Sequence, residues 1–169
     1  MPTSHRPLAT LVTLCLFSAL GGPPAQAQTF GPGNGLINDS ARELDRGRWD
    51  KGVELVQQAF RSGDITPMNM AAAYNNLCIG LTGQHKFDEA IDACNRALNF
   101  QPREWKFYNN RANIYFYLGE YDRALAEYYK AMTFSHGDSI LMSNIGITLS
   151  HRRVFGSNPG RARDNEKSS

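Results

Sequence analysis

The fold of this chain is decided by "AAYNNLCIGL" at residues 72–81, which recurs in related form as "KFYNNRANIY" at residues 106–115. Tyr-Asn-Asn stands in both stretches at an offset of 34 residues, and Asn144 follows in "MSNIGIT" at the same interval. Asparagine is a mediocre helix former, so its regular return needs a structural or functional reason. Self-similarity at a fixed period of this size is typical of repeat proteins.

The surrounding residues predict pairs of amphipathic helices. In "FDEAIDACNRAL" (residues 87–98) and "YDRALAEYYKAM" (residues 121–132), apolar residues recur at the i, i+3, i+4 and i+7 spacing of one helix face. The upstream stretch "GRWDKGVELVQQAF" (residues 47–60) matches the same pattern, after an insertion of four residues between the units. Downstream, "DSILMSNIGITLSHR" (residues 138–152) matches only the first helix of a unit.

These residues resemble the tetratricopeptide repeat, a family of helix–turn–helix units of about 34 residues. The large, small and aromatic residues that carry the resemblance are Tyr74, Leu77, Leu81, Phe87, Ala90, Ala97 and Pro102 in one unit and Tyr108, Ala112, Tyr115, Gly119, Tyr121, Ala124, Tyr128 and Ala131 in the next. Arg111, His136 and Gly52 depart from the family pattern. The resemblance implies an all-α fold, in which antiparallel helix-pair repeats form a short right-handed superhelical solenoid.

The repeat register predicts how the chain is organised. The expected segments are a tetratricopeptide-like domain over residues 36–152, with units at about 36–66, 67–102 and 103–136 and a capping helix at 138–152, a flexible segment at 28–35 and a disordered tail at 153–169. The tail is polar and mixed in charge, which disfavours a packed structure. Gly83 and Gly119 fall near predicted helix junctions, where glycine suits a left-handed C-terminal cap.

The first 27 residues have the layout of a secretory signal peptide. A slightly basic start precedes an apolar run of 13 residues, and Ala25-Gln26-Ala27 forms an A-x-A cleavage site. The run is shorter than the roughly 20 residues that span a bilayer. We expect cleavage after Ala27, no membrane span in the mature chain and export, best fitted by a bacterial periplasm. An uncleaved anchor is the alternative.

Composition and motifs argue against catalysis and nucleic-acid binding. The 169 residues carry a formal net charge of +2, which is no strong electrostatic attraction to nucleic acid. The chain contains no Walker loop, G-x-G-x-x-G or G-x-S-x-G motif. Beyond the leader, His85, His136 and His151 are far apart and do not stand at metal-ligand spacing from cysteines or carboxylates. We therefore expect no enzymatic activity, no metal and no cofactor.

The repeated asparagines point away from the predicted core, because a helix turns by about 100° per residue. In tetratricopeptide arrays this face of each first helix lines a concave groove. The resemblance thus implies a peptide groove lined by Asn38, Asn76, Asn110 and Asn144, with Lys106, Asn113, Tyr117 and Ile79 beside them. Amides both donate and accept hydrogen bonds, as binding an extended peptide backbone requires. The alternative is that these amides bridge neighbouring helices or lie in solvent.

Two further side-chain arrangements have open alternatives. Tyr117, with Phe116 and Ile147, either adds an apolar pocket to the groove or packs against a neighbouring helix. Cys78 and Cys94 stand on the two helices of one unit, and an oxidising compartment favours a disulfide between them. An expected offset of one helical turn instead favours two buried thiols.

The predicted function is a non-catalytic protein-interaction module that binds an extended peptide or protein segment of unknown identity in its groove. A complete carboxylate clamp is not expected, because Ile79, Ile140 and Asn144 do not suit one. The alternative function is structural: a subunit of an envelope complex, or a homo-oligomer packed end to end through residues such as Tyr128 or Met132, with the groove unused.

Overall fold

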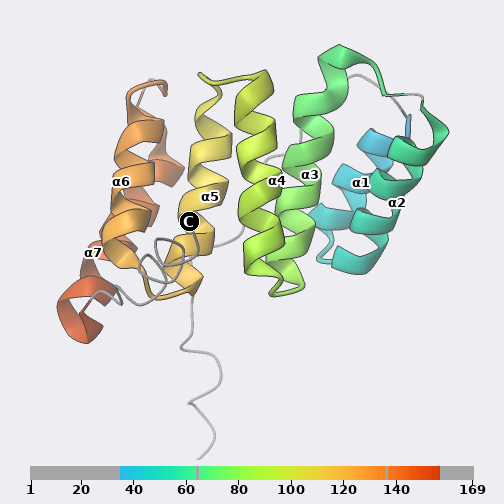
Figure 1. The fold of residues 1–169 in the computed structure, drawn as a ribbon. Coiled ribbons are helices and arrows are strands. Elements are labelled where there is room, and N and C mark those ends of the chain that lie inside the picture. The colour runs from blue at the N-terminus through green and yellow to red at the C-terminus, as the bar shows by residue number, and fades with distance from the viewer. Residues whose placement is uncertain (1–34, 64, 136, 157–169) are drawn as a thin grey trace, which may run out of the picture.

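The computed structural model describes residues 35–63, 65–135 and 137–156, and every regular element within these ranges is a helix. The elements are α1 (Gly35–Asp45), α2 (Trp49–Ser62), the 3-10 turn η1 (Pro67–Asn69), α3 (Met70–Gly83), α4 (Phe87–Phe100), α5 (Trp105–Tyr117), α6 (Tyr121–Met132) and α7 (Ser139–Phe155). The antiparallel pairs α1–α2, α3–α4 and α5–α6 stand side by side, and α7 follows α6 (Figure 1). The predicted all-α helix-pair fold is confirmed.

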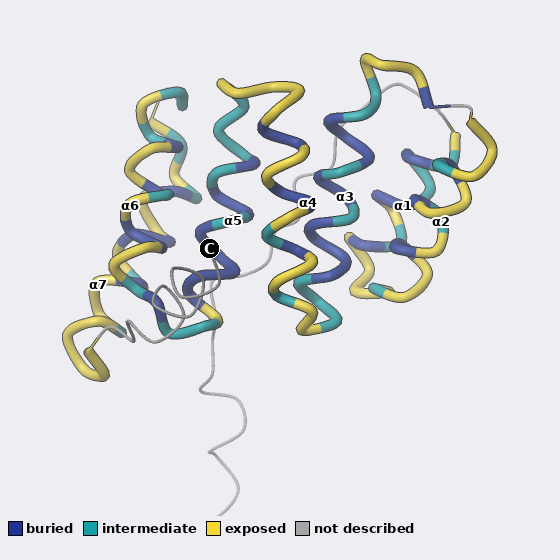
Figure 2. The backbone as a smooth tube through the Cα atoms, in the orientation of Figure 1, coloured by how far each residue is buried: buried dark blue, intermediate teal, exposed yellow. Residues whose placement is uncertain are grey.

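The first helix of each unit is buried more completely than the second. Nine of the 14 residues of α3 are buried, against five of 14 in α4, and the same contrast separates α5 from α6 (Figure 2). The reason is that α3 packs against its own partner α4 and also against α1, α2 and α5. A first helix therefore has to be compatible with burial on several sides, whereas a second helix needs only one apolar face.

Small residues let the paired helices approach closely around a few large ones. Ala90, Ala97, Ala124 and Ala131 are all fully buried in α4 and α6. The largest fully buried side chain is Tyr128, whose hydroxyl donates a hydrogen bond to Asn113 Oδ1 at 2.6 Å. Burial raises the pKa of the Tyr128 phenol well above its usual 10. Tyr128 is therefore a core residue, and the prediction that it forms an end-to-end contact is wrong.

The repeated asparagines link the first helices of successive units. Asn110 Nδ2 on α5 donates to Asn75 Oδ1 on α3 at 2.8 Å. One unit later, Asn144 Nδ2 on α7 donates to Asn109 Oδ1 on α5 at 2.9 Å. The second asparagine of each Tyr-Asn-Asn position thus donates to the first asparagine of the preceding unit.

The same link exists across the four-residue insertion, with different acceptors. Asn76 Nδ2 on α3 donates to the main-chain oxygen of Ile37 at 3.0 Å and to Ser40 Oγ at 2.9 Å, both on α1. Ile37 stands where later units have the first asparagine, so its main-chain carbonyl takes the place of the missing amide. We call the interhelical contacts of Asn75, Asn76, Asn109, Asn110 and Asn144 the amide relay. Its members are at most 5% exposed.

A disulfide joins the two helices of the second unit. Cys78 on α3 and Cys94 on α4 are bonded, with their Cα atoms 5.2 Å apart and both side chains fully buried. The Cα separation lies within the range of ordinary disulfides. The offset of one helical turn expected between these cysteines is absent, because the antiparallel pair brings them level.

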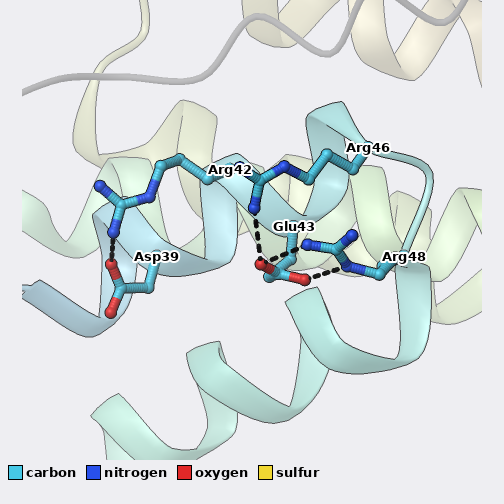
Figure 3. A network of polar contacts seen from close by, with 5 residues as sticks. All are labelled: Asp39, Arg42, Glu43, Arg46 and Arg48. Atoms are coloured by element: carbon cyan, nitrogen blue, oxygen red, sulfur yellow. Dashed lines mark hydrogen bonds and ion pairs between the residues drawn. The ribbon is translucent and has the colours of Figure 1, made fainter.

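Charged residues close the first unit, where apolar residues close the others. The Glu43 carboxylate on α1 accepts hydrogen bonds from Arg46 and from both ends of the Arg48 guanidinium, and Arg42 pairs with Asp39 (Figure 3). The hydrogen bond from Arg48 is the main reason that the pKa of Glu43 is lowered from its usual value. Because Arg48 directly precedes α2, this network ties the start of α2 to α1.

A half-buried ion pair explains the departure from the family pattern at Arg111. Its guanidinium donates to both carboxylate oxygens of Glu127 on α6 at 2.8 Å and to Asn95 on α4 at 2.5 Å. Arg111 therefore connects three helices at a place where a leucine is usual. Such a bidentate pair has strong geometric preferences.

The helix bounds differ from the prediction mainly at the C-terminal end. Helix α7 continues to Phe155, so residues 153–155 are helical and not part of a disordered tail. The predicted signal peptide, most of the flexible segment, His136 and the rest of the tail lie outside the described residues. Among the described helices, none has the length and apolar character needed to cross a membrane.

Candidate functional site

A pocket of about 210 Å³ opens between α2, α3 and α5. Its lining residues are Trp49, Ile79, Thr82, Gly83, His85, Asn110, Asn113 and Tyr117. Ile79 and Gly83 lie on the side of α3 that does not carry Cys78 and Leu81, which pack against α4. The pocket therefore belongs to the face of the first helices that is turned away from their partner helices.

Trp49 and Gly83 form one wall together. Trp49 is the first residue of α2, and its indole ring lies directly on the last turn of α3. A Cβ atom added at Gly83 would stand 2.3 Å from Trp49 Cδ2. Since real Cβ contacts are not that short, glycine is needed here for the ring to take this place. The predicted role of Gly83 as a left-handed cap is wrong.

His85 occupies the left-handed position instead. Its φ is +59°, whereas the equivalent residues after α1 and α5 are Gly47 and Gly119, with φ of +72° and +73°. A side chain in this region costs about 1–2 kcal/mol relative to an ordinary conformation. Backbone strain of this kind is often found at functional sites, and here it sets an imidazole at the rim of the pocket.

Tyr117 forms the opposite wall and is held by other aromatic rings. Its ring stacks on Phe87 with 6.3 Å between centroids and meets Phe116 edge-on at 6.1 Å. The side chain is nevertheless 41% exposed. Partial burial raises the pKa of the Tyr117 phenol above its usual 10, so the hydroxyl keeps its proton at neutral pH. A bound group would thus meet a rigid aromatic surface with a neutral donor.

The polar groups of the pocket are largely engaged within the protein. Asn113 Oδ1 accepts from Tyr128, Asn110 Nδ2 donates to Asn75, and the Thr82 hydroxyl donates to the main-chain oxygen of Cys78 at 2.8 Å. No Lys, Arg, Asp or Glu side chain lines the pocket. What the pocket offers a ligand is mainly the apolar surface of Trp49, Ile79 and Tyr117.

The structure contradicts the predicted groove row of asparagines. Asn76, Asn110 and Asn144 are 0%, 5% and 1% exposed and hydrogen-bonded to the preceding first helix. They point away from their own partner helices, as predicted, but that direction leads into the neighbouring unit. The alternative, in which the amides bridge neighbouring helices, is the one that the structure supports.

The remaining predicted groove residues separate into two groups. Ile79, Asn113 and Tyr117 line the pocket together with Asn110. Lys106 begins the other end of α5, where its ammonium lies 5.9 Å from the Trp105 ring centroid, and Asn38 is half-buried on α1. Neither lines the pocket. No group of side chains in the described part of the chain has the arrangement of a metal site.

Trp49, Thr82, Gly83 and His85 are pocket residues that the sequence reasoning missed. Trp49 was matched with Tyr121, which indicated a core role for it. A signal was present in the glycine pattern: the register puts Gly47 and Gly119 at the left-handed position, so Gly83 needed a different explanation.

Comparisons with known proteins agree with this fold. Residues 81–139 match the family model of the tetratricopeptide repeat. Human Tetratricopeptide repeat protein 16 is 26% identical over 129 residues, which is 72% of this chain but only 14% of that protein's length. The chain therefore spans about a seventh of this curated relative.

Two solved structures are similar in shape. The first TPR of Spaghetti (RPAP3), bound to the HSP90 peptide SRMEEVD, has a TM-score of 0.58 and 17% identity, over 68% of this chain and 88% of the other. The Sgt2 TPR domain from Aspergillus fumigatus has a TM-score of 0.59 and 15% identity, over 83% of this chain and 99% of the other. At these identities the likeness shows the fold: a tetratricopeptide-like solenoid of helix pairs.

Proposed function

We propose that this chain is a tetratricopeptide-repeat adaptor that binds an extended protein segment and encloses one apolar side chain of it between α2, α3 and α5. The family match over residues 81–139 and the two solenoid neighbours support an interaction module. The pocket supports the place of binding. Its volume of about 210 Å³ is below the roughly 300–1,000 Å³ of small-molecule sites, which suits a single side chain better than a whole ligand.

The apolar lining of the pocket is the observation that carries this proposal. A charged ligand group would lose its hydration and find no charged side chain of opposite sign among the lining residues. An aromatic or branched aliphatic side chain would instead be covered by Trp49, Ile79 and Tyr117, and burying one contributes about 1.5–3 kcal/mol. We therefore propose that the bound segment presents a residue such as phenylalanine or leucine, flanked by extended backbone.

This specificity differs from that of one solved neighbour. The Spaghetti TPR structure holds the peptide SRMEEVD, which has three acidic residues. Binding such a peptide requires cations, and neither Lys106 nor any other basic side chain except His85 reaches the pocket of this chain. We propose an apolar anchor here and no preference for an acidic C-terminus.

Tyr117→Ala tests the site, because Tyr117 is exposed enough for its loss to leave the core intact. A library of peptides that differ in one central residue is the probe. We expect the chain to select peptides with central phenylalanine, leucine or tryptophan, and Tyr117→Ala to weaken the selected peptide by about tenfold, in line with the loss of part of one buried aromatic contact. Isothermal calorimetry measures the affinity.

The control for this experiment is Tyr129→Ala on α6. Tyr129 is also a half-exposed tyrosine, at 50%, but it does not line the pocket. It is expected to bind the selected peptide like the unchanged chain. Selection of acidic or basic peptides, or equal binding by Tyr117→Ala, would count against the proposed site.

We also propose that the chain is exported. The leader pattern of residues 1–27 and the buried Cys78–Cys94 disulfide both suit an oxidising compartment. The expected mature N-terminus is Gln28, which N-terminal sequencing of the protein recovered from the envelope fraction measures. Recovery of an intact N-terminus from that fraction would support the uncleaved anchor instead.

A further inference from the structure

The last helix exposes a row of residues that other units keep covered. Helix α7 buries Leu141, Asn144, Ile145 and Thr148, and its other side exposes Met142, Gly146 and Leu149. Met142 and Leu149 are 57% and 38% exposed. They stand four residues before and three residues after Gly146, so all three lie on one stripe of the helix. We call these three residues the α7 stripe.

The 34-residue register shows what kind of surface this stripe is. Its equivalents are Tyr74, Cys78 and Leu81 on α3, and Tyr108, Ala112 and Tyr115 on α5. Cys78 and Leu81 pack against Ala90, Ala93 and Cys94 of α4, and Ala112 and Tyr115 pack against Ala124, Leu125 and Tyr128 of α6. In both units this face is therefore covered by a second helix. The described residues contain no helix after α7.

The rest of the chain is unsuited to cover the stripe. Residues 157–169 read "SNPGRARDNEKSS", in which the only apolar residue is Ala162. A segment of this composition has almost no apolar surface to bury against Met142 and Leu149. The cover has to come from another chain if the stripe is to leave solvent.

Gly146 indicates that the covering element is a helix that approaches closely. A Cβ added there would meet nothing within 4 Å, so no contact within the chain requires glycine. Glycine inside a helix is less favourable than alanine by about 1 kcal/mol. The equivalent residues Cys78 and Ala112 are also small, and both are fully buried under a second helix. A small residue at 146 therefore fits a helix packed directly over it.

We propose that the covering element is α7 of a second copy of this chain, packed antiparallel about a two-fold axis near Gly146. An isologous interface requires a surface that complements itself, and the stripe does. With Gly146 opposite Gly146, Met142 lies beside Leu149 of the other copy. Asp138 and Arg153, at eight residues before and seven after Gly146, bring opposite charges together at each end. The antiparallel arrangement also aligns opposite helix dipoles.

Sedimentation of the full chain over a wide range of concentrations tests the proposal. We expect a reversible dimer in the unchanged chain. The double variant Met142→Glu and Leu149→Glu places four carboxylates at the interface, and it is expected to weaken the dimer by at least about tenfold, since juxtaposed like charges are strongly unfavourable. Both residues are exposed in one chain, so the helical circular dichroism and the Cys78–Cys94 bond should be unchanged.

The matched control is Met68→Glu. Met68 is an exposed apolar residue, at 83%, on η1 and far from α7 in the sequence. It should leave the dimer as it is. A dimer that weakens equally in Met68→Glu, or that persists in the double variant, would overturn the proposal, as would a chain that remains monomeric at every concentration.

A second measurement locates the axis. In Gly146→Cys the new thiols of the two copies would face each other, so mild oxidation is expected to give a covalent dimer, whereas Met68→Cys should give none. Equal crosslinking in both variants would also contradict the proposed geometry. Because the stripe is on α7 and the pocket lies between α2, α3 and α5, the peptide-binding experiment and this one succeed or fail separately.

Discussion

Replacing Cys78 and Cys94 together with alanine is expected to lower the free energy of unfolding by about 3 kcal/mol. The disulfide closes a loop of about 16 residues, and loop-closure entropy predicts this value for a loop of that length. Alanine removes the bond and leaves no buried polar group behind. Urea denaturation, monitored by circular dichroism, measures the difference.

Reduction supplies the control for the cysteine variant. Adding a reductant should destabilise the unchanged chain by a similar amount and should leave the double alanine variant unaffected. Peptide mapping without reduction should recover the segments of α3 and α4 that carry Cys78 and Cys94 as one linked species. An equally stable reduced chain would mean that the closely packed alanines around this pair, not the bond, hold the two helices together.

Asn109→Leu is expected to cost about 2–3 kcal/mol, the second largest effect. Asn109 is 2% exposed and accepts the hydrogen bond from Asn144 Nδ2. Asn144 Oδ1 has no hydrogen-bond partner within the described residues. Leucine at 109 would therefore leave the Asn144 amide buried with neither its oxygen nor its nitrogen paired. An unpaired buried group of this kind costs about 1–3 kcal/mol, and a fully unpaired amide lies at the upper end.

A double-mutant cycle separates this cost from a change in packing. When Asn109→Leu and Asn144→Leu are combined, both partners become apolar, and such pairs are often nearly neutral. The double variant should therefore recover part of the stability that Asn109→Leu loses. Asn99→Leu on the exposed side of α4 is the control and is expected to change stability little. If the two single losses simply add, the hydrogen bond is not what matters at this interface.

The fold was predictable because the repeat constrains it many times over. The same small and aromatic residues recur at 34-residue intervals, and each recurrence supports the same helix pair. Even the insertion between the first two units was found from the offset between Trp49 and Phe87. A pattern repeated in this way leaves few alternative folds consistent with every unit.

The asparagines were misplaced because a helical wheel gives a direction and not a neighbour. Asn76 and Asn110 do point away from their own second helices. In a solenoid, however, each first helix has the preceding first helix beside it, and this contact buries the same face. The sequence did contain a sign of this: the period repeats both asparagines of Tyr-Asn-Asn, and a donor paired with an acceptor one unit earlier needs two positions.

The pocket was only partly predictable, for a related reason. Ile79, Asn113 and Tyr117 were expected on this face from the register alone. Trp49 reaches the site from another unit, over a glycine whose purpose is visible only when the two helices are placed together. Contacts between side chains of different units depend on interhelical distances, which the pattern of one helix does not contain.

The amide relay also has a consequence for how such a chain can change in length. Each link runs from the later unit to the earlier one, since the second asparagine donates to the first asparagine of the unit before. If residues 103–136 were duplicated in tandem, the copy would find its acceptor in Asn109, and Asn144 would find its acceptor in the copy. Whole units can therefore be gained or lost with every such amide still paired, whereas a shift of a single residue within a unit would misalign donor and acceptor along the array.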